Sequence, residues 1–336
     1  MKSDQVTNKT ILQRAKTWIM ILVVVFIAPL LVPLNPSLGT VDNTAYLDPD
    51  SQFLQVNGVS IHYKQYGQGE PTFILLHGTL ATTYTWHKVI DEFSAMGTVI
   101  VYDRPAFGLT SRPMPGSWSG AGPYGHEQQA DLLVSLMDAL KIDKAILVGH
   151  SLGGAIAGLA AQKYPERVST LILVAPGQTR HGVSSVAGWL FATPQMRHIG
   201  PIFLRNRVEE FGMDLYRNSY HDPEKITDVD IQAYSKIFAI ENFYRAIWEL
   251  LVAARPLDAV VHYEMISAPT LVITGDDDNV LGTENNIVLA DIIPQAELSI
   301  IRQCGHIPQE ECPQPFMDEI HKYLDNQGDK PGGIVH

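Results

Sequence analysis

The chain has 336 residues, 46% hydrophobic and 18% charged, which is enough apolar material for one large globular core. Its formal net charge of -12 argues against nucleic acid as a partner, because a phosphate backbone is bound through clustered Lys and Arg. Two cysteines are too few for a disulfide framework, although Cys304 and Cys312 are close enough in sequence for one local bridge.

The N-terminus carries an apolar run preceded by basic residues. Residues 1–17 form a basic tail, and the uncharged run over residues 18–34 is about 17 residues long, the short limit for spanning a bilayer. We expect a membrane anchor, with a cleaved signal segment as the alternative, because small residues follow the run and Pro29 and Pro33 interrupt it. Both alternatives place the main domain outside the cytoplasm, since the basic residues precede the run. Residues 35–52 are predicted to be a polar linker.

Short apolar segments bounded by turn residues predict the strands of an α/β domain. The segments Phe53 to Val56 and Ser60 to Tyr66 flank Asn57-Gly58 and predict a hairpin. Buried parallel strands are expected at 72–76, 99–102, 145–148, 170–174, 270–274 and 297–301. Helical spacing at 126–140, 152–163 and 313–324 completes a doubly wound, mostly parallel α/β core over residues 53–176 and 263–325.

Residues 177–262 interrupt this alternation of strands and helices. They contain no convincing strand but four helical candidates, at 183–192, 199–215, 228–240 and 243–254. We therefore expect a helical cap inserted between two strands of the core. The polar, Gly-containing residues 326–336 are predicted to be a disordered tail.

The motif Gly149-His150-Ser151-Leu152-Gly153 lies directly between a predicted strand and a predicted helix. A catalytic serine hydroxyl has to protrude from a sharp strand-to-helix turn, and flanking glycines relieve the crowding of such a turn. The helix adds its N-terminal dipole, and the amide of Leu152 faces the place where an oxyanion would form. The motif therefore indicates a nucleophilic serine, Ser151.

A serine nucleophile requires a base, and the base requires an acid that orients it. His306 follows the last predicted strand and precedes the terminal helix, which places it at the carboxyl edge of the sheet. The loop after the strand 270–274 offers Asp276, Asp277 and Asp278, and spacing alone does not choose among them. Asp103 is a fourth candidate, with a structural turn paired to the neighbouring arginine as its alternative role.

The chain order Ser151, late aspartate, His306 resembles that of α/β-hydrolase-fold enzymes over about residues 56–324. Three further motifs are similar to the family's oxyanion loop (His77-Gly78-Thr79), its turn (residues 103–108) and its histidine loop (Cys304-Gly305-His306). The resemblance implies that Asp278 is the acid and that the amides of Thr79 and Leu152 form the oxyanion hole. The chain departs from the family in lacking a proline shortly after that acid.

The resemblance implies a hydrolase that needs neither metal nor organic cofactor. Haloalkane dehalogenases and epoxide hydrolases of this fold use an aspartate where this chain has Ser151. We therefore expect a serine hydrolase that acts, through an acyl-enzyme intermediate, on carboxylic esters or related acyl substrates with a small hydrophobic acyl group. The alternatives are C–C bond hydrolysis of a diketone, a haloperoxidase-like perhydrolase on the same triad, and a non-catalytic binding module at the membrane. The sequence does not indicate an oligomeric state.

Overall fold

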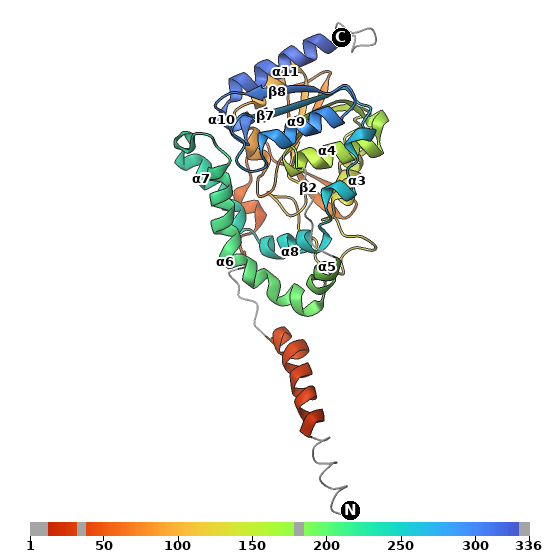
Figure 1. Ribbon diagram of the computed structural model, residues 1–336, viewed down its shortest axis with the longest axis vertical. Helices are drawn as coiled ribbons and strands as arrows, with labels where there is room; N and C mark the ends of the chain where they lie inside the picture. The colour runs from red at the N-terminus through yellow and green to blue at the C-terminus, as the bar shows by residue number, and fades with distance from the viewer. Residues whose placement is uncertain (1–12, 32–37, 178–184, 329–336) are drawn as a thin grey trace, which may run out of the picture.

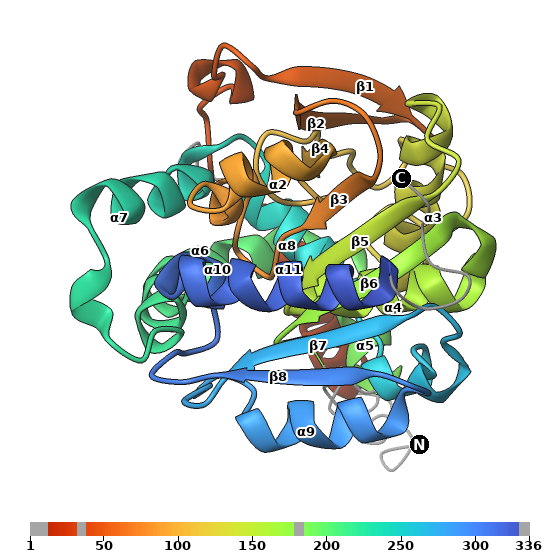
Figure 2. The same cartoon turned by 90° about the horizontal axis from the view of Figure 1, so that it is seen from above.

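The computed structural model describes residues 13–31, 38–177 and 185–328, and an eight-stranded sheet forms its centre (Figures 1 and 2). The strand order is β1-β2-β4-β3-β5-β6-β7-β8. The first two strands and β4 pair antiparallel, whereas all the other neighbours run parallel. The predicted mostly parallel α/β sheet with an N-terminal hairpin is therefore confirmed. The strands are β1 (Gln52–Val56), β2 (Val59–Tyr66), β3 (Thr72–Leu76), β4 (Thr98–Tyr102), β5 (Ala145–His150), β6 (Val168–Val174), β7 (Thr270–Gly275) and β8 (Glu297–Ile301).

Helices cover both faces of the sheet (Figure 2). One face packs against α3 (His126–Ala139), α4 (Leu152–Lys163) and α9 (Thr283–Ile292). The other packs against α2 (Ile90–Met96) and α11 (Pro313–Gly328), which follows the short helix α10 (Pro308–Glu311). The arrangement arises because parallel strands need crossover connections, and each helix buries its apolar face against the sheet.

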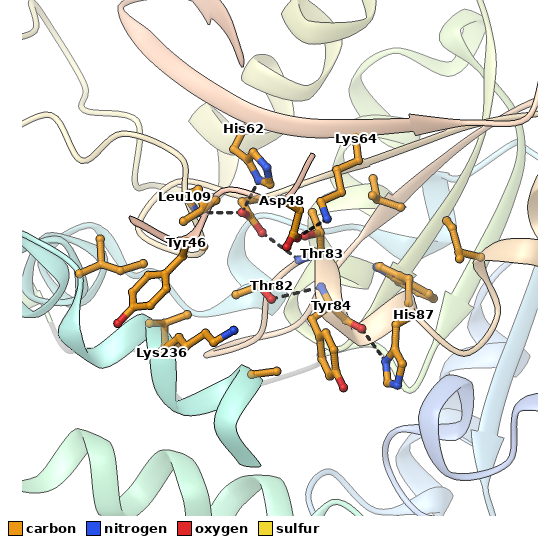
Figure 3. A pocket seen from close by; sticks show the side chains of 18 of the residues that line it. Tyr46, Asp48, His62, Lys64, Thr82, Thr83, Tyr84, His87, Leu109 and Lys236 are labelled. Atoms are coloured by element: carbon orange, nitrogen blue, oxygen red, sulfur yellow. Dashed lines mark hydrogen bonds and ion pairs between the residues drawn. The ribbon is translucent and has the colours of Figure 1, made fainter. Parts of the chain in front are cut away.

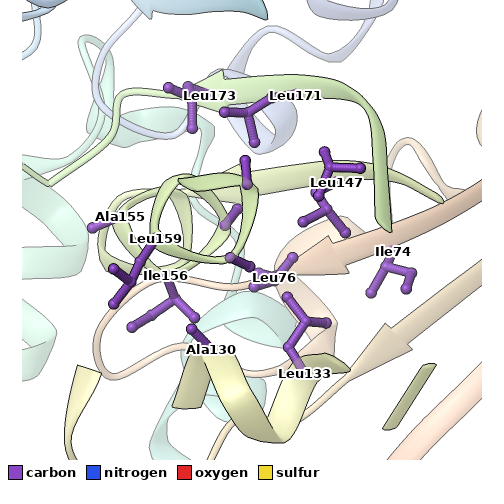
Figure 4. Close-up of a cluster of buried hydrophobic side chains, with 14 of the residues drawn as sticks. Ile74, Leu76, Ala130, Leu133, Leu147, Ala155, Ile156, Leu159, Leu171 and Leu173 are labelled. Carbon is purple, nitrogen blue, oxygen red and sulfur yellow. The ribbon is translucent and has the colours of Figure 1, made fainter. Parts of the chain in front are cut away.

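The central strands are apolar on both faces, as a sheet covered on both sides requires. In β3, Ile74 and Leu76 point into the cluster beneath α3 and α4, shown in Figure 4, whereas Phe73 and Leu75 point into the cluster beneath α2 and α11. This alternation follows from the two-residue period of a strand. The result is a rigid platform whose carboxyl edge carries the loops after β3, β5, β7 and β8.

The helices between β6 and β7 form the segment that we call the cap: α5 (Ser185–Phe191), α6 (Pro194–Asn218), α7 (Asp228–Ser235) and α8 (Phe243–Ala253). In Figure 1, α5, α6 and α8 lie below the sheet and α7 lies to its left. Each predicted cap helix has a counterpart, although α6 begins earlier and ends later than expected. The helix begins early because Pro194 suits its first turn and the Thr193 side chain caps its N-terminus by accepting a hydrogen bond from the amide of Met196.

One predicted boundary is wrong. The predicted tail starts too early, because α11 continues to Gly328; the rest of that tail, residues 329–336, lies outside the described residues. The segment predicted to be a polar linker also contacts the cap, because the amides of Thr40 and Val41 donate to the carbonyl of Ala239 at 3.1 Å and Leu38 is buried.

The N-terminal segment projects away from the body on the side of the cap (Figure 1). Residues 13–22 are α-helical and are followed by a π-helical turn, η1 (Val23–Ile27), and a 3-10 turn, η2 (Ala28–Leu31). Residues 32–34 of the predicted membrane segment lie outside the described residues. Within the described ranges, no helix combines the length and the apolar character needed to cross a membrane.

Candidate active site

Ser151 occupies a sharp turn between β5 and α4. Its backbone has φ 52° and ψ -123°, a conformation that a residue with a side chain rarely adopts and that places Ser151 above the sheet edge. The turn brings backbones so close that a Cβ at Gly149 would lie 2.6 Å from the carbonyl oxygen of Gly153, and one at Gly153 would lie 2.4 Å from the carbonyl oxygen of Leu76. The glycines of the motif are therefore sterically required.

The structure brings Asp278, and not its two neighbours, against His306. The Asp278 Oδ2 atom lies 2.9 Å from His306 Nδ1, and both side chains are buried. Asp277 instead contacts the exposed His221 at 2.8 Å, and Asp276 accepts a hydrogen bond from the amide of Cys304. Burial opposes ionisation of Asp278, but the hydrogen bond from His306 and those from the amides of residues 280 and 281 outweigh it, so its pKa is lowered.

Asp103, the fourth candidate acid, lies away from His306. It pairs with His62, Oδ2 to Nδ1 at 2.7 Å, and accepts hydrogen bonds from the amides of Thr83 and Leu109. These contacts agree with the alternative role of Asp103 in a structural turn, but its partner is His62 of β2 and not the neighbouring arginine. His62 and Asp103 line a separate cavity of about 390 Å³ between the core and the cap, in which Lys236 extends from the cap (Figure 3).

Ser151 and His306 line one cavity of about 400 Å³ that also contains Thr79 and Leu152 in its wall. Among the described residues, no hydrogen bond joins Ser151 to His306, and the amides of Thr79 and Leu152 have no hydrogen-bond partner. Rotation about the one side-chain torsion of Ser151 moves its hydroxyl relative to His306. The two free amides are donors available to an oxyanion at this wall.

A buried arginine that sequence reasoning did not single out holds the loop carrying Thr79. The Arg104 side chain donates to the carbonyls of His77 and Gly78 at 2.8 and 2.9 Å and to Gln129. The Arg104 amide donates to His77 Nε2, so the His77 proton lies on Nδ1, which donates to the Gly78 carbonyl. Burial and the neighbouring guanidinium lower the pKa of His77 to about 3, so its ring stays neutral. The clue in the sequence to the role of Arg104 was its position directly after Asp103, the aspartate of the turn.

The loop that carries His306 is also fixed at several points. His150 Nε2 donates to the His306 carbonyl at 3.0 Å, and the His306 amide donates to the carbonyl of Ser219 at the end of α6. Burial holds the pKa of His150 well below its usual range, so this ring too is neutral. A disulfide joins Cys304 to Cys312 and closes the loop around the histidine.

Cys304 and Cys312 lie close enough to the carboxylate of Glu311 to suggest a metal site. Both sulfurs are in the disulfide, however, and the Glu311 carboxylate accepts hydrogen bonds from the amides of Gly305, His221 and Asp222. A disulfide sulfur is not the thiolate that a metal requires. These residues therefore stabilise the histidine loop instead.

Comparisons with known proteins agree with this geometry. The family model described as alpha/beta hydrolase fold matches residues 71–223. The chain is 30% identical over 284 residues to a 2-hydroxy-6-oxo-6-phenylhexa-2,4-dienoate hydrolase of Burkholderia cepacia, which covers 79% of this chain and 93% of that protein. Among solved structures it is similar to Est816, an N-acyl homoserine lactone degrading enzyme, with 27% identity and a TM-score of 0.64 over 81% of this chain and 99% of that one. It is also similar to a thermophilic esterase from Thermogutta terrifontis, with 25% identity and a TM-score of 0.63 over 82% and 98% of the two chains.

The match in sequence extends over most of both chains, and the sheet order and the strand-to-helix turn at Ser151 are those that the motifs imply. On these grounds the chain belongs to the α/β-hydrolase fold family.

Proposed function

We propose that this protein is a serine hydrolase that cleaves carboxylic esters, with Ser151 as nucleophile, His306 as base and Asp278 as the acid that orients the base. One observation carries the proposal: His306, paired with the buried Asp278 at 2.9 Å, lines the same cavity as a serine on a strained strand-to-helix turn. A hydroxyl in this setting shares its cavity with the proton acceptor that a serine nucleophile requires.

In the proposed reaction the Ser151 oxygen attacks the ester carbonyl while His306 Nε2 accepts the hydroxyl proton. The amides of Thr79 and Leu152 bind the oxyanion, each contributing on the order of 3 kcal/mol to the transition state. Protonated His306, stabilised by Asp278, donates its proton to the departing alkoxide. Water then hydrolyses the acyl-enzyme by the same steps in the same cavity.

The proposed substrate has a small or medium hydrophobic acyl group, since leucine, alanine and phenylalanine side chains form much of the cavity wall. A second candidate is C–C bond hydrolysis of a ketone, because the 30% identical relative is a hydrolase of a 2-hydroxy-6-oxo-dienoate. Both reactions would use the same triad. They differ in the leaving group, which is an oxygen in ester hydrolysis and a carbon in C–C bond hydrolysis.

Labelling by a fluorophosphonate probe tests the nucleophile. Wild-type protein should be labelled and Ser151→Ala should not, whereas folded wild-type protein without labelling would indicate a non-catalytic binding module. A panel of p-nitrophenyl esters of increasing chain length then measures kcat/KM. If 2-hydroxy-6-oxo-6-phenylhexa-2,4-dienoate is cleaved about tenfold more efficiently than the best ester, C–C hydrolysis replaces ester hydrolysis as the main activity.

We also propose that residues 18–34 attach the protein to a lipid membrane, with the catalytic domain on the extracytoplasmic side. The proposal is supported by the exposed apolar side chains of Trp18, Met20 and Leu22 and by the basic residues that precede them. The full chain should sediment with membranes after alkaline carbonate treatment. Recovery in the soluble fraction without its first 34 residues would instead indicate a cleaved signal segment.

A further inference from the structure

The catalytic cavity carries a permanent positive charge although the protein as a whole is acidic. Apart from its histidines, the charged side chain among the described residues of its wall is Arg255, and no Asp or Glu is among them. The rest of the wall is largely apolar, with Leu80, Leu215 and Leu257 as examples. Arg255 itself is exposed, so its charge lies where the cavity meets solvent. The part of the cavity at Arg255 therefore favours an anion, in contrast to the net charge of -12.

The guanidinium of Arg255 is not used within the protein. Among the described residues, no carboxylate lies within ion-pair distance of it and no acceptor is hydrogen-bonded to it. Other arginines are engaged: Arg197 forms a bidentate pair with Glu249, and Arg104 donates to three buried acceptors. A guanidinium presents N–H donors in a planar fork that matches a carboxylate. Arg255 thus offers an unfilled binding position at the wall of the cavity.

His126 adds a hydrogen-bonding group to the wall of the same cavity. It begins α3, and the residue before it, Gly125, lies against the end of α8, since a Cβ at Gly125 would be 3.9 Å from the Cβ of Ala253. Both His126 and Arg255 line the cavity. The Nδ1 atom of His126 is buried and has no hydrogen-bond partner among the described residues. Burial, together with the charge of Arg104, lowers the pKa of His126 to about 4, so the ring is neutral and has one N–H to donate.

Building on the proposed ester hydrolysis, we propose that Arg255 and His126 form an anion subsite that selects esters bearing a carboxylate at a distance from the scissile bond. The guanidinium pairs with the carboxylate, and the His126 N–H supplies a further donor. The hydrocarbon between carboxylate and ester lies along the leucine-rich wall. A substrate of this kind fits a cavity of about 400 Å³ that is lined largely by apolar side chains, with the Ser151 and His306 pair and the Arg255 position as polar parts of its wall.

The test compares two p-nitrophenyl esters of matched shape, the hemiglutarate, which carries a carboxylate, and its neutral methyl ester. The quantity measured is the ratio of their kcat/KM values. We expect wild type to favour the anionic ester and Arg255→Gln to lower the ratio about tenfold, with a smaller loss for Arg255→Lys, which keeps the charge but not the fork. His126→Gln should lower the ratio less than Arg255→Gln does. Arg217→Gln is the matched control, because that exposed arginine pairs with Asp214 outside the cavity.

A second pair, 4-(valeryloxy)benzoate and its methyl ester, places the carboxylate on the leaving group. Selectivity lost with Arg255→Gln in either pair supports the subsite, and high salt should weaken the wild-type preference. Ratios that are the same in wild type and Arg255→Gln for both pairs overturn it.

If the proposed function is wrong, wild type will cleave neither the anionic nor the neutral esters, which distinguishes that failure from failure of the subsite. The subsite is then tested by binding: calorimetry measures the dissociation constants of N-(4-nitrophenyl)glutaramate and its methyl ester on wild type and Arg255→Gln. Tighter binding of the anionic amide that depends on Arg255 supports the subsite without any turnover. Equal dissociation constants for the two amides overturn it.

Discussion

Glu310 is a buried carboxyl group that joins the core to the cap, and its replacement by glutamine tests what holds the two together. It lies on α10, and its carboxylate accepts hydrogen bonds from Thr85 of the core and from Tyr216, Tyr220 and Tyr234 of the cap. Burial raises the pKa of Glu310 from 4.5 to about 7, against the effect of these four hydroxyl donors. The folded protein therefore keeps a proton on Glu310 that the unfolded chain loses near pH 4.5.

The sign and size of the effect follow from this difference. Because the pKa is raised on folding, the contribution of Glu310 is present in full below pH 4.5 and is lost as the pH rises through about 7. A rise from 4.5 to about 7 corresponds to about 3 kcal/mol of unfolding free energy over the whole range. The glutamine in Glu310→Gln cannot titrate. As the pH rises from 5 to 8, the unfolding free energy of Glu310→Gln should therefore increase by about 2 to 3 kcal/mol relative to that of wild type.

Urea unfolding of wild type and Glu310→Gln at several pH values between 5 and 8 measures this difference. Taking the difference between the two proteins removes the titration of other groups near Glu310, namely its three tyrosines, His87, Lys88 and Asp230. Glu264→Gln is the control, because that carboxylate is exposed and pairs with the exposed His262. An offset between wild type and Glu310→Gln that is equal at pH 5 and pH 8 would refute the reasoning, since it would mean that the buried carboxyl does not titrate there.

Three further predictions concern the site. Asp278→Asn should lower kcat for a p-nitrophenyl ester by about 10³- to 10⁴-fold, because His306 loses the acid that fixes its tautomer. Asp277→Asn should retain activity in the same assay, and a larger loss for Asp277→Asn than for Asp278→Asn would show that the acid is misassigned. Reduction of the Cys304–Cys312 disulfide, or its replacement by two alanines, should lower the unfolding free energy by about 2 to 3 kcal/mol in urea titrations, as expected for a loop of this length; equal midpoints for the oxidised and reduced protein would contradict it. Arg104→Lys leaves buried carbonyls without donors and should lower the unfolding free energy by about 1 to 3 kcal/mol. It should also slow fluorophosphonate labelling of Ser151, and unchanged labelling would show that Arg104 does not position the oxyanion loop.

Much of the fold could be predicted because its determinants are local. The two-residue period of the apolar segments and the three- to four-residue period of the helices depend on near neighbours in the chain, and each predicted strand is present. Ser151 could be recognised for the same reason, since the glycines that its turn requires are its own neighbours in sequence. His306 followed from its place after the last strand, because parallel strands end at one edge of a sheet.

What the sequence determined alone was thus the order of elements and the serine and histidine at the sheet edge. Spacing did not distinguish Asp278 from Asp276 and Asp277, and only the resemblance to the family pointed to Asp278. The tertiary structure showed the contact itself, because three adjacent carboxylates have the same chemistry and differ only in which one the loop directs to His306. The tertiary structure also paired Asp103 with His62 and placed Arg255 in the cavity wall. These contacts join residues that are distant in the chain, and their energies depend on packing and burial that no local pattern encodes.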